Sequence, residues 1–518
     1  MNPLSNYWLA TDGNGPISIS VMASIAIAVI TIATFLIIKR STNRDLPPGP
    51  GGLPLIGNLL SLDPDLHSYF AALARSHGPI YKLHLGQKLG VVVTSPDLAK
   101  QVLKIQDTTF ANRDVPVAGK EASYGGSDIV WTPYGPEWRM LRKVCVREML
   151  SGATLDSVYA LRRRELRHTI AHLHRKAEAA AAVDVGEQMF LTVMNVITSM
   201  LWGGTVEGEE REGLGAEFKQ VVGQMTELLG APNFSDFFPV LERLDLQGIQ
   251  KRMRGLAKRF DGIFETMIDR RLKMGGGGGS KDFLQILLQM KDASGDGDST
   301  PFTIRHVKAL LMDMVVGGTD TTSNSVEFAL AEMMNKPHIL KKVQQEIDSV
   351  IGKDKIVEES DINKLPYLYL VMKETLRLHP VLPLLVPHCP SATSVVAGYT
   401  IPKGARIFVN VWAIHRDPSV WEDPLEFRPE RFSDGKWDYS GNDFKYFPFG
   451  SGRRICAGVA MAERMFMYSL ASLLHSFDWS VPDGHKLDLE EKFGIVLKKK
   501  HPLIAIPTPR LSDPSLYD

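Results

Sequence analysis

Phe449-Gly450-Ser451-Gly452-Arg453-Arg454-Ile455-Cys456-Ala457-Gly458 is a glycine-dense loop that stands directly before a helical pattern, Val459 to Leu474. Backbone N–H groups and the helix dipole stabilise a thiolate at the N-terminus of a helix. A soft thiolate suits iron, and glycines on both sides allow a flat macrocycle to approach the backbone closely. The loop therefore predicts that Cys456 is a metal ligand.

The chain has three cysteines, Cys145, Cys389 and Cys456, which lie far apart in the sequence. This spacing fits neither a disulfide framework nor a zinc site built from paired cysteines. A reducing compartment agrees best with the count. The ordinary interpretation of a lone cysteine is a buried structural residue, and we keep it for Cys145 and Cys389.

Length and composition predict one large globular body. Of the 518 residues, 44% are hydrophobic, which is enough for a substantial core. Because neither an internal repeat nor a shift in composition divides the chain, we expect a single catalytic domain over residues 66–518. Lys plus Arg and Asp plus Glu are equal at 59 each, so no overall field draws the protein to nucleic acid.

A mostly helical body is predicted from Leu66 onward, with short strands at Ile80–Leu85, Val91–Thr94 and Ala405–Val411. Ser123 to Pro136 is rich in Gly and Ser, which predicts a loop that covers a site. Five consecutive glycines within residues 274–280 predict a flexible surface linker without chemistry of its own.

The N-terminal region predicts a membrane anchor. Residues 17–38 are uncharged and are followed by Lys39, Arg40 and Arg44, and a helix of about 20 residues crosses a bilayer. A cleaved signal peptide fits less well, because no Lys or Arg precedes the run. The Lys/Arg bias places residues 1–16 in the lumen and the catalytic domain in the cytosol. Residues 39–65 then form a basic flank and a proline-rich hinge. We expect a single-pass protein of the endoplasmic reticulum membrane.

A long helix is predicted from Thr303, as its cap, to the residue before Pro337. Its middle contains Gly317-Gly318-Thr319-Asp320-Thr321-Thr322, although each glycine costs about 1 kcal/mol relative to alanine in a helix interior. This cost suggests a functional need. The alternative is that the threonines only bond the preceding turn and bend the helix. Asp313, one turn earlier, is interpreted as a structural carboxylate rather than a catalytic acid.

Five spaced positions of the cysteine loop resemble the haem-ligand loop of the cytochrome P450 family: Phe449, Gly452, Arg454, Cys456 and Gly458. The resemblance covers nearly the whole chain, because other segments occur in the family's order: the proline-rich hinge, Trp138, Gly317–Thr322, Glu374–Arg377 and Pro429–Phe432. It implies a mainly α fold with small β-sheets behind an N-terminal transmembrane helix. It also implies haem b ligated by Cys456, with NADPH electrons supplied through a flavoprotein reductase.

The same resemblance implies roles for individual residues. Asp320 and Thr321 would relay protons, and Gly317 and Gly318 would leave space above the haem. Further cofactor contacts would come from Trp138, Arg142, Arg454 and His388, as donors to the haem propionates. A structural cluster would be formed by Glu374, Arg377 and Arg431; taken alone, the first two would be an ordinary surface pair worth about 0 to 1 kcal/mol.

Partners and substrate are implied in the same way. Arg139, Lys143 and Arg147 form a basic stripe where family members dock their reductase, although such a stripe is usually just a solvated helix face. The expected substrate pocket is apolar and consists of Ile129, Val130, Met314, Val315, Val381, Leu382, Leu384 to Val386, and Ile495 to Leu497, a segment that includes Val496. O2 and a small lipophilic substrate are the expected ligands.

The sequence most resembles plant enzymes that hydroxylate terpenoids, including cadinene-type sesquiterpenes, with flavonoid hydroxylases as close relatives. Two other classes remain open. One is a family member that rearranges peroxides without a reductase, and the other is a haem-binding protein without catalysis. The retained Asp320-Thr321 pair and the uninterrupted cysteine loop favour a monooxygenase over both.

Overall fold

The structure is a computed structural model that describes Ile27 and residues 45–203, 209–273, 282–294 and 300–518. Its described part is mainly helical, as predicted. The helices are α2 (Leu66–His77), α3 (Pro96–Lys100), α4 (Asp107–Phe110), α5 (Val117–Ala122), α6 (Pro136–Val144), α7 (Gly152–Ser157), α8 (Tyr159–Glu178), α9 (Val185–Trp202), α10 (Glu209–Gly230), α11 (Phe234–Phe237), α12 (Ile249–Lys273), α13 (Phe283–Ala293), α14 (Ile304–Asn335), α15 (Pro337–Ile351), α16 (Pro366–Leu378), α17 (Val411–Ile414) and α18 (Val459–Ser476).

Shorter helical turns connect these elements. Two are π-helical, η2 (Gln101–Ile105) and η3 (Cys145–Met149), and each directly continues a helix. The others are 3-10 turns: η1 (Leu59–Ser61), η4 (Pro239–Leu244), η5 (Glu359–Lys364), η6 (Pro429–Phe432), η7 (Gly452–Arg454) and η8 (Pro514–Tyr517).

Four small sheets complete the described part. The strands are β1 (Ile80–Leu85), β2 (Lys88–Val93), β3 (Val183–Asp184), β4 (Ser394–Val396), β5 (Tyr399–Ile401), β6 (Arg406–Val409), β7 (Phe477–Ser480), β8 (Glu491–Lys492), β9 (Lys498–Lys499) and β10 (Ile504–Pro509). One sheet has the order β1-β2-β6, with β1 antiparallel and β6 parallel to β2. A second has the order β3-β10-β7, and the pairs β4-β5 and β8-β9 stand alone.

The predicted strand Ala405–Val411 is longer than the observed one. β6 ends at Val409, because the side chain of Asn410 accepts a hydrogen bond from the N–H of Ala413 at 3.0 Å and so caps α17. The predicted strand Ile80–Leu85 coincides with β1.

The predicted anchor at residues 17–38 lies outside the described residues except for Ile27, and so does the glycine linker at 274–280. Among the described residues, none of the helices combines the length and the apolar character that a membrane crossing requires.

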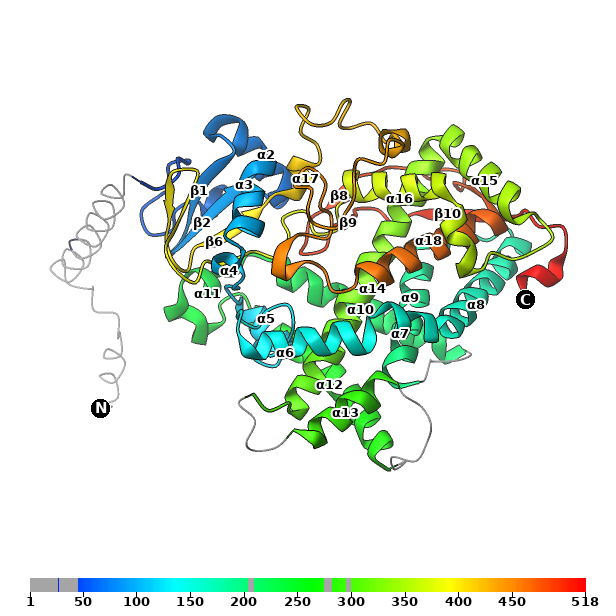
Figure 1. Cartoon of the computed structure of the whole chain (residues 1–518), viewed down its shortest axis with the longest axis horizontal. Helices are drawn as coiled ribbons and strands as arrows, with labels where there is room; N and C mark the ends of the chain where they lie inside the picture. Colours follow the sequence, from blue (N-terminus) through cyan, green and yellow to red (C-terminus); the bar gives the residue numbers. More distant parts are fainter. Residues whose placement is uncertain (1–26, 28–44, 204–208, 274–281, 295–299) are drawn as a thin grey trace, which may run out of the picture.

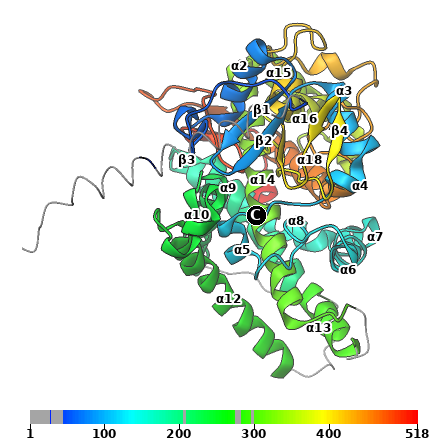
Figure 2. The same cartoon turned by 90° about the vertical axis from the view of Figure 1, so that its left-hand side faces the viewer.

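α14 is the central element, as its sequence predicts: it begins directly after Thr303 and ends two residues before Pro337. It packs along α9 and also contacts α10, α12 and α18. Figure 1 shows α14 passing through the middle of the molecule beside α18, and Figure 2 shows its N-terminal half running next to α12.

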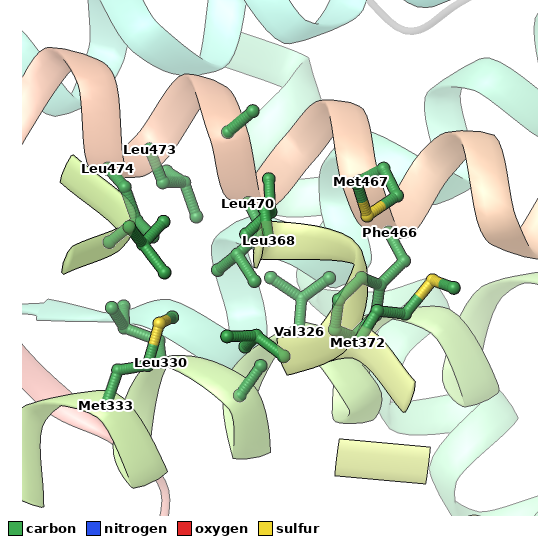
Figure 3. Packing of buried hydrophobic residues seen from close by; sticks show 14 of the residues in the cluster. Val326, Leu330, Met333, Leu368, Met372, Phe466, Met467, Leu470, Leu473 and Leu474 are labelled. Atoms are coloured by element: carbon green, nitrogen blue, oxygen red, sulfur yellow. The ribbon is translucent and has the colours of Figure 1, made fainter. Parts of the chain in front are cut away.

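The C-terminal half of α14 is buried against α16 and α18. Figure 3 shows the side chains that fill this contact: Val326, Leu330, Met333, Leu368, Met372, Phe466, Met467, Leu470, Leu473 and Leu474. A fully buried side chain of this kind contributes roughly 1.5–3 kcal/mol. This packing fixes α18, and with it the cysteine loop at its N-terminus, against the glycine-containing part of α14.

Candidate active site

A cavity of about 340 Å³ lies between the middle of α14 and the cysteine loop. Cys456 and its neighbours Phe449 and Gly458 form part of its wall, and Gly317 and Thr321 of α14 line it as well. Residues separated by more than a hundred positions in the sequence therefore meet at one site. Its remaining wall is largely apolar, and it includes most of the residues that were predicted as a substrate pocket.

The cysteine loop is closed by backbone contacts. The N–H of Cys456 donates to the carbonyl of Phe449 at 3.0 Å, and the N–H of Gly458 donates to the Cys456 sulfur at 3.3 Å. Gly452 has a φ of +68°, and a Cβ at this position would overlap the carbonyl oxygen of Leu103. The glycine is therefore required by the packing of the loop on η2, which is a different reason from the approach of a macrocycle that the sequence predicted.

The Cys456 side chain is accessible from the cavity although protein surrounds it. Burial raises the pKa of its thiol, while the Gly458 N–H and the charge of Arg142 act in the opposite direction. Burial therefore has a larger effect on the thiol pKa than the Gly458 N–H does. The sequence predicted instead that the helix N-terminus stabilises the thiolate. A metal cation on the sulfur would supply the missing charge, since a coordinated thiol is deprotonated outright.

The middle of α14 presents Gly317 and Thr321 to the cavity. A Cβ on Gly317 would meet nothing within 4 Å, so this glycine leaves open space. The Thr321 hydroxyl donates to the carbonyl of Gly317 at 3.0 Å, which is the bond that the bent-helix alternative predicted. Gly318 lines the cavity too, but a Cβ there would overlap the tip of Ile197 on α9. Gly318 therefore also allows α9 to approach α14.

Asp320 is turned away from the cavity. Its Oδ2 forms an ion pair with Nζ of Lys498 at 2.7 Å and accepts a hydrogen bond from Thr226 at 3.2 Å. Its Oδ1 accepts from Asn324 Nδ2 at 3.2 Å. Thr226 lines the cavity and Asp320 does not. The structure thus does not place Asp320 beside Thr321 at the cavity wall, and neither Thr226 nor Lys498 has a local sequence pattern that identifies it.

Arg142 points to the cavity with an unused guanidinium. Within the described ranges, no hydrogen bond or ion pair engages its side chain. Burial lowers the pKa of this group, and the Cys456 side chain partly opposes that effect. A cation so placed near the sulfur suits an anionic group of a bound cofactor.

Two other predicted propionate donors are occupied by the protein. Trp138 Nε1 donates to the carbonyl of Ile129 at 3.0 Å. The guanidinium of Arg454 lies over the Trp138 ring, 4.6 Å from its centroid, and donates to the carbonyls of Ala111, Ile129 and Thr132. In this structure Arg454 fastens the loop that contains Ile129 to the cysteine loop, and Trp138 fastens it to α6.

His388 lines the cavity, but its environment disfavours a charge. Burial and the neighbouring Arg113 hold the pKa of its imidazole well below its ordinary value. Because Nδ1 donates to the carbonyl of Phe110 at 2.9 Å, the neutral ring keeps an unprotonated Nε2. In this neutral form Nε2 has no proton to donate, and the propionate contact of His388 stays a prediction.

Arg113 was not predicted from the sequence and also lines the cavity. It donates to the carbonyls of Val130, Val386 and Pro387 at 2.9 to 3.2 Å. It therefore joins two stretches of the cavity wall that are far apart in the sequence. No periodic pattern surrounds Arg113, so the sequence offered no signal for it.

The apolar wall agrees with the prediction except at three positions. Val315 is fully buried in the core, and the next residue, Val316, lines the cavity instead, because each residue of a helix turns the side chain by about 100°. Leu384 and Leu497 also lie in the interior of the protein. The predicted residues that do line the cavity are Ile129, Val130, Met314, Val381, Leu382, Leu385, Val386, Ile495 and Val496.

Asp313 and Asp128 form a pair of carboxyl groups in the cavity wall. Asp313 Oδ2 accepts from the N–H of Ile129 at 2.8 Å, and Asp128 Oδ1 accepts from the N–H of Trp131 at 2.7 Å. Burial raises the pKa of both groups, and the two side chains share a hydrogen bond. Asp313 thus ties the loop to α14, in line with the structural interpretation given to it from the sequence.

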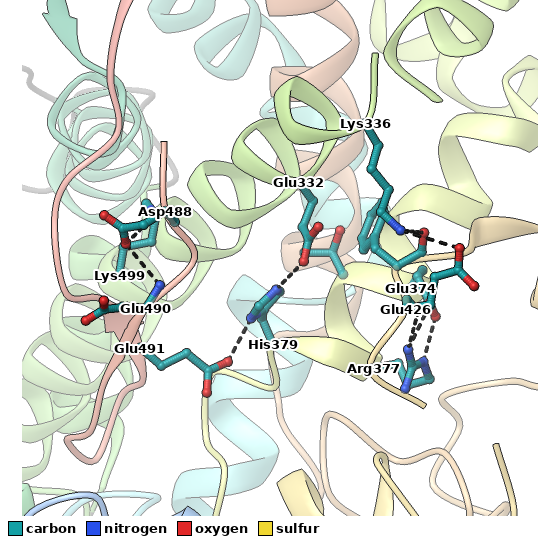
Figure 4. Close-up of polar contacts among 12 residues, drawn as sticks. Glu332, Lys336, Glu374, Arg377, His379, Glu426, Asp488, Glu490, Glu491 and Lys499 are labelled. Carbon is teal, nitrogen blue, oxygen red and sulfur yellow. Dashed lines mark hydrogen bonds and ion pairs between the residues drawn. The ribbon is translucent and has the colours of Figure 1, made fainter. Parts of the chain in front are cut away.

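Glu374, Arg377 and Arg431 meet in the interior, away from the cavity. The two ends of the Arg377 guanidinium donate to the Glu374 carboxylate at 2.7 and 2.8 Å, and Arg431 Nε donates to it at 2.9 Å. Figure 4 shows the contact between Glu374 and Arg377. Arg377 also donates to the carbonyls of His415, Pro424 and Glu426, so the cluster holds the segment before η6 on α16.

The predicted reductase-docking residues are all exposed on one side of the molecule. Arg139 and Lys143 lie on α6, and Arg147 lies in the π-helical turn η3 that continues it. The Arg139 guanidinium lies 5.7 Å from the centroid of the Tyr134 ring. The stripe is thus available to a partner.

Taken together, the residues of the cavity fit a haem group. The donor set contains a thiol suited to iron and a cation, Arg142, without a partner in the described part of the chain. The surrounding wall is apolar, and Gly317 leaves open space on the side that faces the sulfur-containing loop.

Comparison with known proteins points to one family. The family model described as "Cytochrome P450" matches residues 47–506. The chain is 40% identical to flavonoid 3'-monooxygenase CYP75B137 of Crocosmia x crocosmiiflora, over 94% of this chain and 98% of that protein. It is 41% identical to geraniol 8-hydroxylase of Swertia mussotii, over 93% of this chain and 97% of that protein.

A solved structure supports the same relationship. A zebrafish cytochrome P450 determined with progesterone superposes with a TM-score of 0.75 at 26% identity, covering 86% of this chain and 99% of that chain.

Proposed function

The chain belongs to the cytochrome P450 family, and from this premise we propose that it hydroxylates a small terpenoid of sesquiterpene size. As a cytochrome P450 monooxygenase it uses haem and takes NADPH electrons through a reductase. The proposed reaction converts R–H, O2, NADPH and one proton into R–OH, water and NADP+. One oxygen atom enters the C–H bond, and the other leaves as water.

The observation that supports this proposal is an aliphatic cavity wall on the same cavity as the Cys456 sulfur. Ile, Val, Leu and Met are the largest group of side chains in this wall, for example Ile129, Val316, Leu382 and Val496. An apolar wall binds a hydrocarbon by removing it from water, at about 25 cal/mol for each Å² that is buried. The relative named geraniol 8-hydroxylase acts, by its name, on a terpenoid alcohol.

The protein's own residues have separable tasks in this reaction. When haem is bound through Cys456, its iron supplies the oxygen chemistry that side chains cannot perform. Arg142 would hold an anionic edge of the cofactor. The apolar wall holds the substrate and excludes water, and the Thr321 hydroxyl and the Asp320 carboxylate would handle protons.

A flavonoid substrate is the second candidate. It is supported by the relative named flavonoid 3'-monooxygenase, which is as similar to this chain as the geraniol 8-hydroxylase. The cavity wall also contains the aromatic rings of Trp131, Phe449 and Phe466, against which a flat ring system would stack.

We also propose that residues 17–38 anchor the protein in the endoplasmic reticulum membrane with its catalytic domain in the cytosol. The support is an uncharged run of the required length with basic residues on its C-terminal side. Arg139, Lys143 and Arg147 would then meet an acidic face of the reductase, since exposed charges of one sign attract a partner of the opposite sign.

The first experiment tests the iron–sulfur bond. The full chain, reduced with dithionite and exposed to carbon monoxide, is expected to give a strongly red-shifted Soret band. Cys456→Ser should lose that band, whereas Cys389→Ser should keep it, because Cys389 is half-buried and does not line the cavity. If the band survives in Cys456→Ser, or no haem binds to the parent, the proposed function is wrong.

The second experiment identifies the substrate class. A sesquiterpene hydrocarbon, geraniol and a flavonoid are compared by the spectral change on binding and by product formed with reductase and NADPH. Product from the sesquiterpene is expected to exceed that from the flavonoid. The opposite ranking would favour the second candidate. Turnover of an added organic hydroperoxide without reductase would indicate a rearrangement enzyme, and haem binding without turnover of any of these compounds would indicate a non-catalytic protein.

A further inference from the structure

The carboxylate of Asp320 is held by three elements that are distant in sequence. Lys498 of β9 approaches its Oδ2 at 2.7 Å, and Thr226 of α10 bonds the same oxygen at 3.2 Å. Asn324, one turn further along α14, donates to Oδ1 at 3.2 Å. The Asp320 side chain is only 7% exposed and the Lys498 side chain is 28% exposed. Lys498 is therefore the most exposed of these four residues.

Lys498 is carried by a hairpin that is fixed in place. Between β8 and β9, Ile495 and Val496 line the cavity, and the N–H of Leu497 donates to the carbonyl of Val381 at 2.7 Å. At the start of β8, Glu491 bonds Trp412 Nε1 at 2.9 Å. Since the backbone is held on both sides, the hairpin keeps the Lys498 side chain within reach of Asp320.

Thr226 connects the same carboxylate to the cavity. Its hydroxyl lies 3.2 Å from Asp320 Oδ2 and 3.0 Å from the carbonyl of Gly223, and Thr226 is part of the cavity wall. A hydroxyl has one hydrogen to donate, so it serves one of these acceptors at a time and also has free lone pairs. The Asp320 carboxylate thus lies between Lys498, which is partly exposed, and Thr226, which lines the cavity.

We propose that Lys498 is a positioning residue for proton supply to the cavity: it holds the Asp320 carboxylate next to Thr226 and connects that carboxylate to solvent. The inference rests on the proposed monooxygenase function. In each transfer, Asp320 takes one proton from water on the Lys498 side and releases one proton inward, through the Thr226 hydroxyl, and so returns to the carboxylate. The step is a proton transfer alone and requires no additional oxidant or reductant.

The test replaces Lys498 by a neutral residue of similar shape. In Lys498→Gln, the fraction of NADPH electrons recovered in product is expected to fall at least threefold, and hydrogen peroxide should account for the difference. Because proton supply then limits turnover, the solvent deuterium isotope effect on product formation should at least double. Lys498→Arg, which restores the positive charge, should recover at least half of the lost product.

Lys500→Gln is the matched control, because it removes the same charge from the same hairpin. Lys500 pairs with the exposed Glu490 at 2.8 Å, its one ion pair within the described part of the chain, and it does not line the cavity. Its product yield and isotope effect are expected to equal those of the parent. If Lys498→Gln matches Lys500→Gln in both measurements, the inference is overturned.

A second variant tests the inward connection without changing any charge. Thr226→Val keeps the shape of the side chain and removes its hydroxyl. It is expected to raise the solvent isotope effect at least 1.5-fold, because proton transfer to the cavity then limits turnover. An unchanged isotope effect in Thr226→Val would overturn the assignment even if Lys498→Gln failed to retain haem.

Thermal unfolding supplies a readout that does not depend on turnover. The lowering of the melting temperature in the double variant Lys498→Gln/Asp320→Asn should be smaller than the sum for the two single variants, since both remove the same ion pair. Additive changes would show that the pair is not coupled. Failure of the proposed function is distinguishable, because it would appear as the absence of product in the parent while the unfolding experiment still reported on the pair.

Discussion

Gly452 shows how a single residue is fixed by its surroundings. Its φ of +68° lies in the left-handed region, and a Cβ would overlap the Leu103 carbonyl oxygen and approach Asp107. Asp107 in turn accepts from the N–H of Arg453 at 3.1 Å. The cysteine loop is therefore attached to η2 and α4 at this point, so a change at Gly452 is expected to displace the loop that carries Cys456.

We predict that Gly452→Ala destabilises the protein by about 2 to 5 kcal/mol. A left-handed conformation costs about 1–2 kcal/mol for a residue with a Cβ, and an overlap in a packed region adds about 1–3 kcal/mol. Gly435→Ala is the control, because Gly435 has a φ of +70° and a Cβ there would meet nothing within 4 Å. Thermal unfolding followed at the Soret band should show the larger decrease for Gly452→Ala; equal decreases would mean that the overlap relaxes freely.

Arg454, Trp138 and Asp320 illustrate the limit of prediction for single residues. Their presence in the sequence indicated the site, but their partners are the carbonyls of Ala111, Ile129 and Thr132 and the ammonium of Lys498. A sequence pattern reports which residue types occur at which spacing. It cannot predict a hydrogen bond to a backbone carbonyl that the fold brings from another part of the chain.

At the scale of the element, α14 combines two kinds of glycine in successive positions. Gly317 borders open space in the cavity, whereas Gly318 accommodates the tip of Ile197 from α9. The periodicity of the helix explains this difference, because successive side chains point about 100° apart. The same rotation places Val316 in the cavity wall and Val315 in the core.

We predict that Gly317→Ala raises the melting temperature, because alanine favours the helix by about 1 kcal/mol and its methyl group meets no other atom. Substrate affinity should fall in the same variant, since the methyl group enters the cavity. Gly318→Ala should gain less stability or lose some, because Ile197 must move. Melting temperatures and spectral titrations with substrate check both expectations, and a destabilised Gly317→Ala would contradict the open space assigned to this position.

At the scale of the whole molecule, a buried polar network joins distant elements. The two nitrogens of His379 lie 2.9 Å from Glu332 of α14 and 2.8 Å from Glu491 of β8. Figure 4 shows these contacts. Glu491 also lies 3.2 Å from Arg416 and 3.4 Å from His67 of α2. The network therefore ties the hairpin of Lys498 to the central helix and to the N-terminal part of the described domain.

This network predicts a pH-dependent stability. Burial alone would lower the pKa of His379, but its hydrogen bonds with Glu332 and Glu491 raise it above its ordinary value of 6.5. The stability that comes from charged His379 is therefore complete below pH 6.5 and is lost as the pH rises through the raised pKa. Despite its burial, Glu491 has a pKa well below 4.5, because it bonds His379 and His67 and lies near Arg416. The stability that comes from charged Glu491 is therefore lost only when the pH falls through this lowered pKa.

We predict that His379→Gln lowers the free energy of unfolding by about 2 kcal/mol near pH 6, the usual contribution of hydrogen bonds to a charged group. The difference from the parent should shrink as the pH rises. His475→Gln is the control with the opposite sign, because burial lowers the pKa of His475 and its contribution is lost on acidification. Melting temperatures measured against pH check both trends, and a constant difference for His379→Gln would contradict a charged histidine.

The sequence alone determined the helical fold class, the position of the cysteine loop before α18, the bounds of α14 and the extent of β1. These features are local, because a helix or a strand is encoded by residues a few positions apart and by the caps and prolines at its ends. The apolar character of the cavity could be predicted as well, since most residues of its wall stand in short apolar runs.

Only the tertiary structure decided which partners the polar residues of the site acquire. Asp320 pairs with Lys498, Asp313 with Asp128, and Arg113 with carbonyls on both sides of the cavity. Each contact joins residues far apart in the chain. A buried polar group requires a hydrogen-bond partner, and the packing decides which group lies within about 3 Å of it. Because that packing depends on how α9, α10, α14 and the β8-β9 hairpin meet, no local pattern contains it.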